Sequence, residues 1–150
     1  MGGGITREGT WVGPGAFLFI SFLMAAQGSA GVIDERQALM RAIGDDLQAI
    51  WDGLARGDGG AVEQGATRIA VQAACLSTLF PPDSFHPPSR AQPAIREEFH
   101  AFEDLALKLK KAAEGLAASA RHGTLAEVQP HLTRLVRTCR QCHRSYIEPY

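Results

Sequence analysis

Two cysteines and a histidine near the end of the chain have the spacing of a cofactor attachment site. Residues 139–143 read Cys-Arg-Gln-Cys-His. This spacing is typical of haem c attachment, in which two thiols add to the two vinyl groups of the macrocycle and the histidine supplies an axial nitrogen to the iron. On a helix, Cys142 lies about 60° from Cys139, and His143 lies about 40° to the other side of Cys139. All three side chains can therefore meet one cofactor.

Two other interpretations of this motif compete with haem attachment. A zinc site needs four ligands in all, and the obvious additional imidazole is His100. His100 lies about 160° from the apolar Phe102 on its own helix, so we expect it to face solvent. A thioredoxin-like dithiol needs a βαβ setting, which the sequence does not contain. The motif therefore favours a single covalent haem c.

The elements that position this motif are helical. Apolar residues recur at helical spacing in four segments of the sequence, and no alternating pattern of strand length is present. The predicted helices span residues 33–54, 62–80, 93–122 and 124–147. Because most of the loops are short, these amphipathic helices predict an all-α fold, an antiparallel four-helix bundle.

Prolines and capping residues mark the ends of the predicted helices. Five prolines between residues 81 and 93 predict a connection at that point. Thr124 and Glu127 have the spacing of a capping box, whereas Pro130 predicts a kink in the last helix or a later start at Pro130 itself. The apolar face of the first helix predicts that Trp51 belongs to the core.

The last predicted helix has two chemically different faces. Cys139, Cys142 and His143 fall on its apolar face, which we expect to point into the core. The opposite face is cationic and is expected to meet solvent. Its arginines are Arg134, Arg137, Arg140 and Arg144.

Composition excludes several classes of protein. The chain has 150 residues, and its 15 Lys and Arg against 16 Asp and Glu leave a net charge of −1, which argues against a nucleic-acid-binding protein. This length allows one domain. Three cysteines are too few for a disulfide scaffold. We expect Cys75, in an apolar stretch, to be a buried small hydrophobe rather than half of an intermolecular disulfide.

The N-terminus has the features of an export signal. Residues 16–26 form an uncharged apolar run that is too short to span a membrane. Small residues at positions 28 and 30 predict a cleavage site after Ala30. We therefore interpret residues 1–30 as a cleaved signal peptide and residues 31–150 as the mature domain. The alternative is an uncleaved N-terminal membrane anchor, the one case in which the protein would be held at a membrane.

The mature chain resembles class II cytochromes c, the family of cytochrome c′ and cytochrome c-556. The resemblance rests on four segments: Arg36-Gln37-Ala38-Leu39-Met40, Leu79-Phe80-Pro81, Pro93-Ala94-Ile95, and the C-terminal Cys-x-x-Cys-His with Tyr146. It implies a periplasmic four-helix bundle, often a homodimer, with haem between the helices near one end.

The resemblance also implies roles for the first predicted helix. It places Met40 over the distal face of the haem, either as the second axial ligand of the iron or only as packing. It makes Arg36 a partner of a haem propionate, with Gln37 assisting at the haem periphery. The alternative for Arg36 is an arginine at a helix start that extends to water. Many cytochromes c′ have a basic residue four positions after the ligating histidine, where this chain has Ile147.

Two functions are compatible with this resemblance. Members are either low-spin electron carriers with methionine as the sixth ligand, or high-spin, five-coordinate forms that bind NO or CO. Because Ile147 departs from the second pattern, we expect a one-electron carrier without catalytic turnover. We further expect a redox partner with an acidic surface to dock on the arginine face of the last helix.

Overall fold

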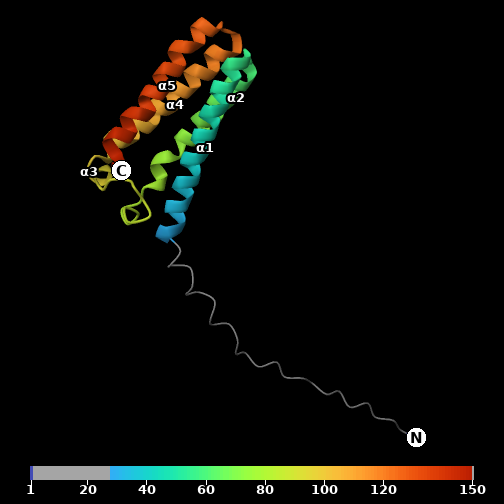
Figure 1. Cartoon of the computed structure of the whole chain (residues 1–150). Helices are drawn as coiled ribbons and strands as arrows, with labels where there is room; N and C mark the ends of the chain where they lie inside the picture. The colour runs from blue at the N-terminus through green and yellow to red at the C-terminus, as the bar shows by residue number, and fades with distance from the viewer. Residues whose placement is uncertain (2–27, 150) are drawn as a thin grey trace.

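Four long helices make up most of the described part of the chain, which comprises residue 1 and residues 28–149 of a computed structural model (Figure 1). They are α1 (Gly28–Arg56), α2 (Gly59–Ala74), α4 (Phe99–His122) and α5 (Leu125–Tyr146). A 3₁₀ segment, η1 (Leu76–Leu79), and a one-turn helix, α3 (Ala94–Glu97), flank the proline-rich connection. The predicted all-α antiparallel four-helix bundle is confirmed.

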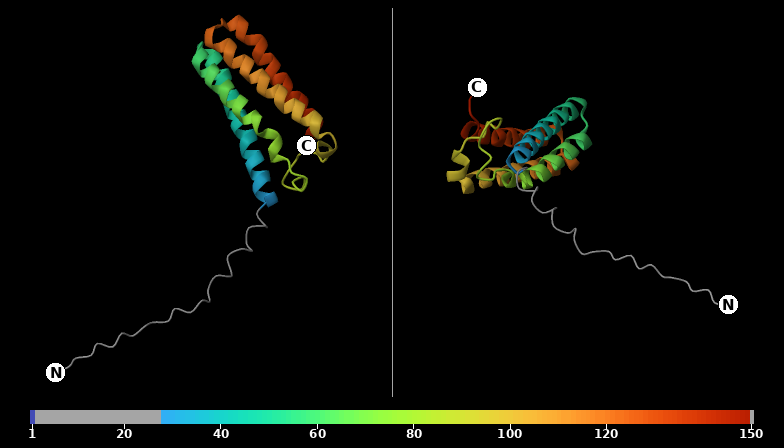
Figure 2. Two further views of the ribbon diagram at one scale, coloured as in Figure 1. Left: turned by 180° about the vertical axis from the view of Figure 1, so that it is seen from behind. Right: turned by 90° about the horizontal axis from the view of Figure 1, so that it is seen from below.

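The bundle is open along one side. Helix α1 packs on α2, α2 packs on α4, and α4 packs on α5, but α1 and α5 are not packed directly on each other. The pairs α1–α2 and α4–α5 converge at the end that holds their turns (Figures 1 and 2). They diverge toward the end that holds the proline-rich connection. We call the resulting opening between α1 and α5 the α1–α5 seam.

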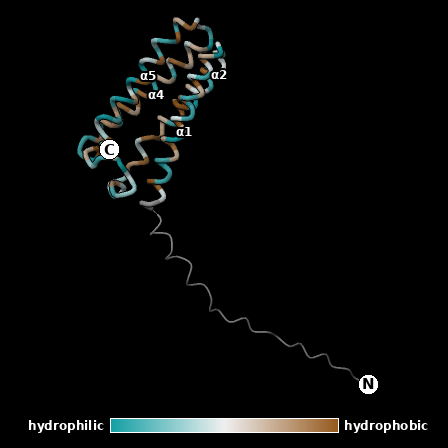
Figure 3. The backbone as a smooth tube through the Cα atoms, viewed as in Figure 1, coloured by the Kyte–Doolittle hydropathy of each residue, from teal (hydrophilic) through white to brown (hydrophobic). Residues whose placement is uncertain are grey.

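The apolar faces of the four helices form the core. Figure 3 shows hydrophobic and hydrophilic residues recurring along each helix, as amphipathic helices require. Each long helix contributes a side chain no more than 1% exposed: Ile50, Ile69, Leu116 and Leu132. Burying a side chain of this size contributes about 1.5–3 kcal/mol to folding, so the core holds the frame that positions the site.

A short turn reverses the chain between α1 and α2. Gly57 has a φ of 69°, a left-handed conformation that glycine adopts without a steric penalty. The N–H of Asp58 donates to the carbonyl of Gly53 at 2.8 Å, and the N–H of Gly57 donates to that of Leu54 at 3.1 Å, which is the Schellman pattern. The carboxylate of Asp58 then caps α2 by accepting from the N–H of Ala61 at 3.0 Å.

Two boundaries described here differ from the sequence prediction, and a third decides between two predicted starts of the last helix. Helix α2 ends at Ala74 rather than Phe80, because the chain tightens into η1 before two consecutive prolines that lack N–H groups. The predicted third helix is divided at Glu98, whose φ of −110° and ψ of 31° are not helical. Helix α5 starts at Leu125, behind the predicted capping box, and runs through Pro130, so the predicted later start at Pro130 is wrong.

Two burial predictions are wrong for related geometric reasons. Cys75 is exposed because α2 ends one residue before it, at the point where the chain turns out of the core. Trp51 is 43% exposed because its face of α1, shared with Met40, points to the α1–α5 seam, where no helix covers it. Both residues follow the apolar pattern of their helices, but that pattern does not say which face lacks a neighbour.

The predicted export signal falls mostly outside the described residues. The apolar run at 16–26 lies in the part that the structure does not describe, and the predicted cleavage after Ala30 falls in the first turn of α1. Among the described helices, none is both long and apolar enough to cross a bilayer. The cleaved signal therefore stays a prediction.

Candidate functional site

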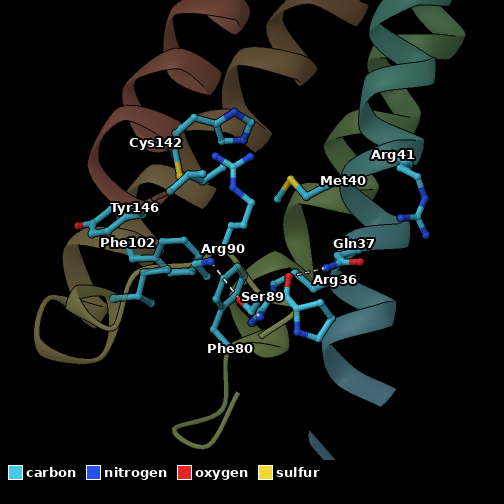
Figure 4. Close-up of a pocket in the computed structure, with 15 residues that line it drawn as sticks. Arg36, Gln37, Met40, Arg41, Phe80, Ser89, Arg90, Phe102, Cys142 and Tyr146 are labelled. Atoms are coloured by element: carbon cyan, nitrogen blue, oxygen red, sulfur yellow. Dashed lines mark hydrogen bonds between the residues drawn. The ribbon is translucent and has the colours of Figure 1, made fainter. Parts of the chain in front are cut away.

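The last turns of α5 bring the three predicted attachment residues to the α1–α5 seam. Cys139 and Cys142 are half-buried and pack against the hydrophobic core. His143 follows in the chain and lines the same hollow as Cys142, which is labelled in Figure 4. The four arginines of the opposite face are all exposed. The prediction of two faces thus holds for Cys139, Cys142 and the arginines, whereas His143 is exposed at the edge of the inner face.

Two apolar cavities meet at these residues. The larger, of about 340 Å³, lies toward the proline-rich connection, and the smaller, of about 220 Å³, lies along the seam between α1 and α5. The larger is lined by aromatic and aliphatic side chains that include Phe80, Ile95 and Phe102. Both cavities share the residues Met40, Cys142, His143 and Ile147. His143 and Met40 thus both line the two adjoining cavities.

Burial changes the protonation chemistry of the attachment residues. It raises the pKa of the Cys139 thiol, and burial together with the neighbouring Cys139 raises the pKa of Cys142 to about 11. Both groups are therefore neutral thiols when no cofactor or metal is bound. Partial burial lowers the pKa of the His143 imidazole, which favours the neutral form that a metal ligand requires.

The zinc and dithiol interpretations find no support in the described part of the chain. No group of three or more histidine, cysteine, aspartate or glutamate side chains is arranged there to hold a metal ion. His100 is fully exposed and pairs with Glu103 at 3.5 Å, as the prediction that it faces solvent requires. The helical surroundings of the cysteines exclude the βαβ setting of a thioredoxin-like site.

Met40 faces the cysteine and histidine residues from α1. It is half-buried, packs against the hydrophobic core and lines both cavities. In Figure 4 its sulfur points into the hollow between α1 and the end of α5. A flat, largely apolar group attached to the two thiols fits this arrangement, with a thioether on one side and an imidazole on the other.

Arg36 is buried rather than extended to water. Its side chain is 5% exposed, and its guanidinium carbon lies 4.4 Å from the ring centroid of Phe80, a cation–π distance. The Nη1 group donates to the carbonyl of Leu79 at 3.0 Å and to the Ser84 hydroxyl at 3.2 Å. The Nη2 group donates to the Ser84 carbonyl at 2.9 Å and to the Ser89 hydroxyl at 2.7 Å. The alternative of an arginine that reaches water is therefore wrong.

These hydrogen bonds bear on the expected propionate contact. The Nη groups of an arginine offer four N–H donors, and all four are directed at loop oxygen atoms here. Only Nε–H is left for a carboxylate. Gln37 also turns to the loop, because its Nε2 donates to the carbonyl of Pro88 at 3.3 Å. Both residues line the larger cavity, and a propionate role for them stays a prediction.

Sequence reasoning missed a second set of contacts, between the loop and the C-terminus. Ala91 and Ile147 form an isolated antiparallel bridge. The N–H of Gln92 donates to the carbonyl of Tyr146 at 2.9 Å, and the N–H of Glu148 donates to that of Arg90 at 2.9 Å. Backbone bonds of this kind leave no pattern in side-chain types, so no signal in the sequence could have revealed them.

Aromatic packing fixes the end of α5 beside the attachment residues. The Phe102 ring lies edge-on to Phe80 at 4.6 Å and to Tyr146 at 5.5 Å, centroid to centroid. The Tyr146 hydroxyl donates to the Glu98 carboxylate at 2.9 Å, and burial, followed by Glu98, raises the pKa of this phenol. Phe102 thus connects α4 with both the loop and α5.

The sequence is similar to a protein family and to individual proteins of the cytochrome c′ and cytochrome c-556 type. A family model described as Cytochrome C′ matches residues 31–146. A cytochrome c-556 from Agrobacterium tumefaciens (strain II Chrys) is 34% identical over 120 residues, which cover 78% of this chain and 97% of the relative. A cytochrome c′ from Rhodopseudomonas palustris (strain ATCC BAA-98 / CGA009) is 29% identical over 128 residues, which cover 81% of this chain and 84% of the relative.

Solved structures agree with these relatives. A cytochrome c′ from Rhodopseudomonas palustris superposes with a TM-score of 0.70 at 25% identity, over 79% of this chain and 96% of the other. A cytochrome c′ with ligand-controlled dimer dissociation superposes with a TM-score of 0.75 at 23% identity, over 83% of this chain and all of the other, 100%.

Proposed function

Because this chain belongs to the cytochrome c′ family of class II cytochromes c and has haem c as its cofactor, we propose that it is a one-electron carrier. In this proposal Cys139 and Cys142 hold the haem, His143 is its proximal ligand, and Met40 is its distal ligand. The observation that carries the proposal is that Met40 and His143 line the same two cavities from opposite helices. Haem iron supplies a metal centre that accepts or gives up a single electron.

The surroundings of the site suit electron transfer. A thioether ligand raises the reduction potential of a haem and fills its coordination sphere, which leaves no ready position for a diatomic gas. The lining of the larger cavity includes the apolar side chains of Phe80, Ile95 and Phe102. The residues around the site thus bind, orient and shield the cofactor, and we assign them no catalytic turnover.

The alternative function is gas binding by a five-coordinate haem. It is favoured by the similarity to proteins named cytochrome c′, and in that case Met40 only packs over the iron. Ile147, which lines both cavities, leaves the position four residues after His143 without the basic side chain of many cytochromes c′. Electron transfer is therefore the better supported of the two functions.

The experiment that decides between them is a measurement of spin state and CO binding. A pyridine-haemochrome spectrum first establishes covalent haem, and its absence would contradict the whole proposal. We expect wild-type protein to be six-coordinate and low-spin, with slow or weak CO binding. Met40→Leu keeps most of the volume, at a packing cost below about 1.5 kcal/mol, and removes the thioether. It should be high-spin and bind CO readily.

Controls separate ligation from packing. Met40→Ala should give the same spectrum as Met40→Leu, but it should cost about 2–5 kcal/mol of stability, so its folding must be verified. Leu47→Ala changes another half-buried side chain of α1 that lines the smaller cavity, and it should stay low-spin. A wild-type protein that is high-spin in both oxidation states makes gas binding the better assignment.

We also propose a docking surface for a redox partner, a cell compartment and an oligomeric state. The exposed arginines of α5 make no ion pair within the described residues, which supports docking of an acidic redox partner on this face. Export to the periplasm follows from the predicted signal peptide at residues 1–30. Self-association as a homodimer is proposed from the solved relative whose dimer dissociates under ligand control.

A further inference from the structure

The site has two walls, the part of α1 that bears Met40 and the part of α5 that bears His143. A loop connects these walls, which do not pack directly on each other. Met40 belongs to α1 and His143 to α5, and these helices meet only across the α1–α5 seam. Residues 79–92, which we call the strap, cross the open end of the bundle between them (Figures 1 and 4). Whatever fixes the strap at both ends therefore fixes the spacing of the two walls.

On the α1 side, the strap is held by Arg36. Its buried guanidinium donates four hydrogen bonds, at 2.7 to 3.2 Å, to Leu79, Ser84 and Ser89. No carboxylate is among these partners. Arg36 lies one helical turn before Met40 on the same side of α1, so a shift of the guanidinium moves the segment that bears the thioether.

On the α5 side, the strap is held by the residues that follow the ligating histidine. Besides the Ala91–Ile147 bridge, the Gln92 side chain donates to the Ile147 carbonyl at 3.0 Å. Arg90 donates through its guanidinium to the Glu148 carbonyl. The N–H of Ile147 in turn donates to the carbonyl of His143 at 3.2 Å, so this attachment reaches the proximal ligand directly.

One hydroxyl joins the two attachments. Ser89 Oγ accepts from Arg36 Nη2 at 2.7 Å and from the N–H of Ala91 at 3.0 Å. A continuous path of hydrogen bonds thus runs from α1 through Arg36 and Ser89 to Ala91, which bridges to Ile147.

We propose that Arg36 is a positioning residue that acts through the strap, setting how closely the wall with Met40 approaches the wall with His143. This inference rests on the proposed haem ligation, because the wall spacing decides how Met40 meets the iron. In this proposal the role of Arg36 depends on the geometry of its forked N–H donors and not on its charge. An arginine presents its N–H groups in a fixed plane, whereas a lysine ammonium is a point charge that cannot reach four acceptors at once.

The test compares Arg36→Lys and Ser89→Ala with wild-type holoprotein. Arg36→Lys keeps the charge but removes the fork, and Ser89→Ala removes the joining hydroxyl without touching α1. Ser89→Ala should raise the ferric high-spin fraction and the CO association rate by about tenfold, because the loss of one buried hydrogen bond shifts a two-state equilibrium by roughly that factor. Arg36→Lys, which loses more than one of its four hydrogen bonds, should raise both by at least as much. A purely structural role would lower the melting temperature and leave the spin state unchanged.

Arg56→Lys is the matched control. Arg56 is an exposed arginine in the last turn of α1, lines neither cavity at the site and makes no hydrogen bond to the strap in the described residues, so its variant should keep the wild-type spin state. If Arg36→Lys and Ser89→Ala both keep the wild-type spectrum and CO kinetics, the inference is wrong. A wild-type spectrum in Arg36→Lys with a shifted one in Arg36→Gln would also overturn it, because charge would then be the active property.

The failure of the strap inference can be distinguished from the failure of Met40 ligation. If wild-type protein is high-spin, the proposed electron-carrier function fails, but the strap still controls how Met40 covers the iron. CO affinity should then change about tenfold in Ser89→Ala and stay unchanged in Arg56→Lys. An unchanged affinity in both Arg36→Lys and Ser89→Ala would overturn the inference about the strap.

Discussion

Phe102 offers a quantitative test of how the site is held together. Its side chain is 2% exposed, and its ring contacts one aromatic residue of the strap and one of α5, Phe80 at 4.6 Å and Tyr146 at 5.5 Å. Phe102→Ala should cost about 3–5 kcal/mol, as large-to-small changes of a buried phenylalanine do. Phe102→Leu keeps most of the apolar volume and loses two edge-on pairs, each worth about 0.5–1.5 kcal/mol, so it should cost about 1–3 kcal/mol.

Thermal and denaturant unfolding of the haem-loaded protein measure these losses. For a domain of this size, each kcal/mol lowers the melting temperature by roughly 4 °C, so we expect decreases of about 12–20 °C for Phe102→Ala and about 4–12 °C for Phe102→Leu. Leu107→Ala is the control on the same helix, because Leu107 is 45% exposed and its loss should stay within about 0.5 kcal/mol. A loss below about 1 kcal/mol for Phe102→Leu would refute the role of ring geometry, and a loss below about 1 kcal/mol for Phe102→Ala would refute the packing itself.

Two further predictions concern charged groups. Glu127 accepts hydrogen bonds from the backbone N–H of Thr124 at 2.7 Å and from the Thr124 hydroxyl at 2.8 Å, and these bonds, the backbone one first, lower the pKa of its carboxyl group. The ionised carboxylate therefore stabilises the fold at pH values above its unfolded-state pKa. This stabilisation is lost as the pH falls through the folded-state pKa. Glu127→Gln should therefore be less stable than wild type at neutral pH and indistinguishable from it in acid, as measured by denaturant unfolding across pH; a gap that persists in acid would contradict this linkage. Replacing both Arg134 and Arg137 by glutamate should slow association with an acidic redox partner by roughly tenfold at low salt and flatten its dependence on ionic strength. Lys108→Glu on α4 is the control, and an association rate that does not vary with salt even in wild type would show that the arginine face is only solvated.

The sequence predicted those features that repeat along a helix. Cys139 and Cys142 were expected on the inner face of the last helix and Arg137 on its outer face, and the structure has them there. The capping box at Thr124 was also readable, because it depends on residues only three positions apart. Local spacing is sufficient for such features because a helix repeats every 3.6 residues.

The strap could not be predicted in the same way. Arg36 bonds to atoms that lie 43 to 53 residues later in the chain, and two of its acceptors are backbone carbonyls, which every residue type offers. The exposure of Trp51 and Cys75 had the same origin, because burial depends on which helix covers a face and not on the pattern of that face. The resemblance predicted a distal role for Met40, and the structure showed which contacts hold the strap to its helix.

The lack of direct packing between α1 and α5 has a consequence for assembly. The helix pairs that pack directly are neighbours along the chain, and contacts of short sequence separation form fastest during folding. Only the strap joins the first helix to the last, through hydrogen bonds rather than a wide apolar interface. The thiols of Cys139 and Cys142 therefore stay reachable from the side of the bundle until the strap closes, without the separation of any helix pair.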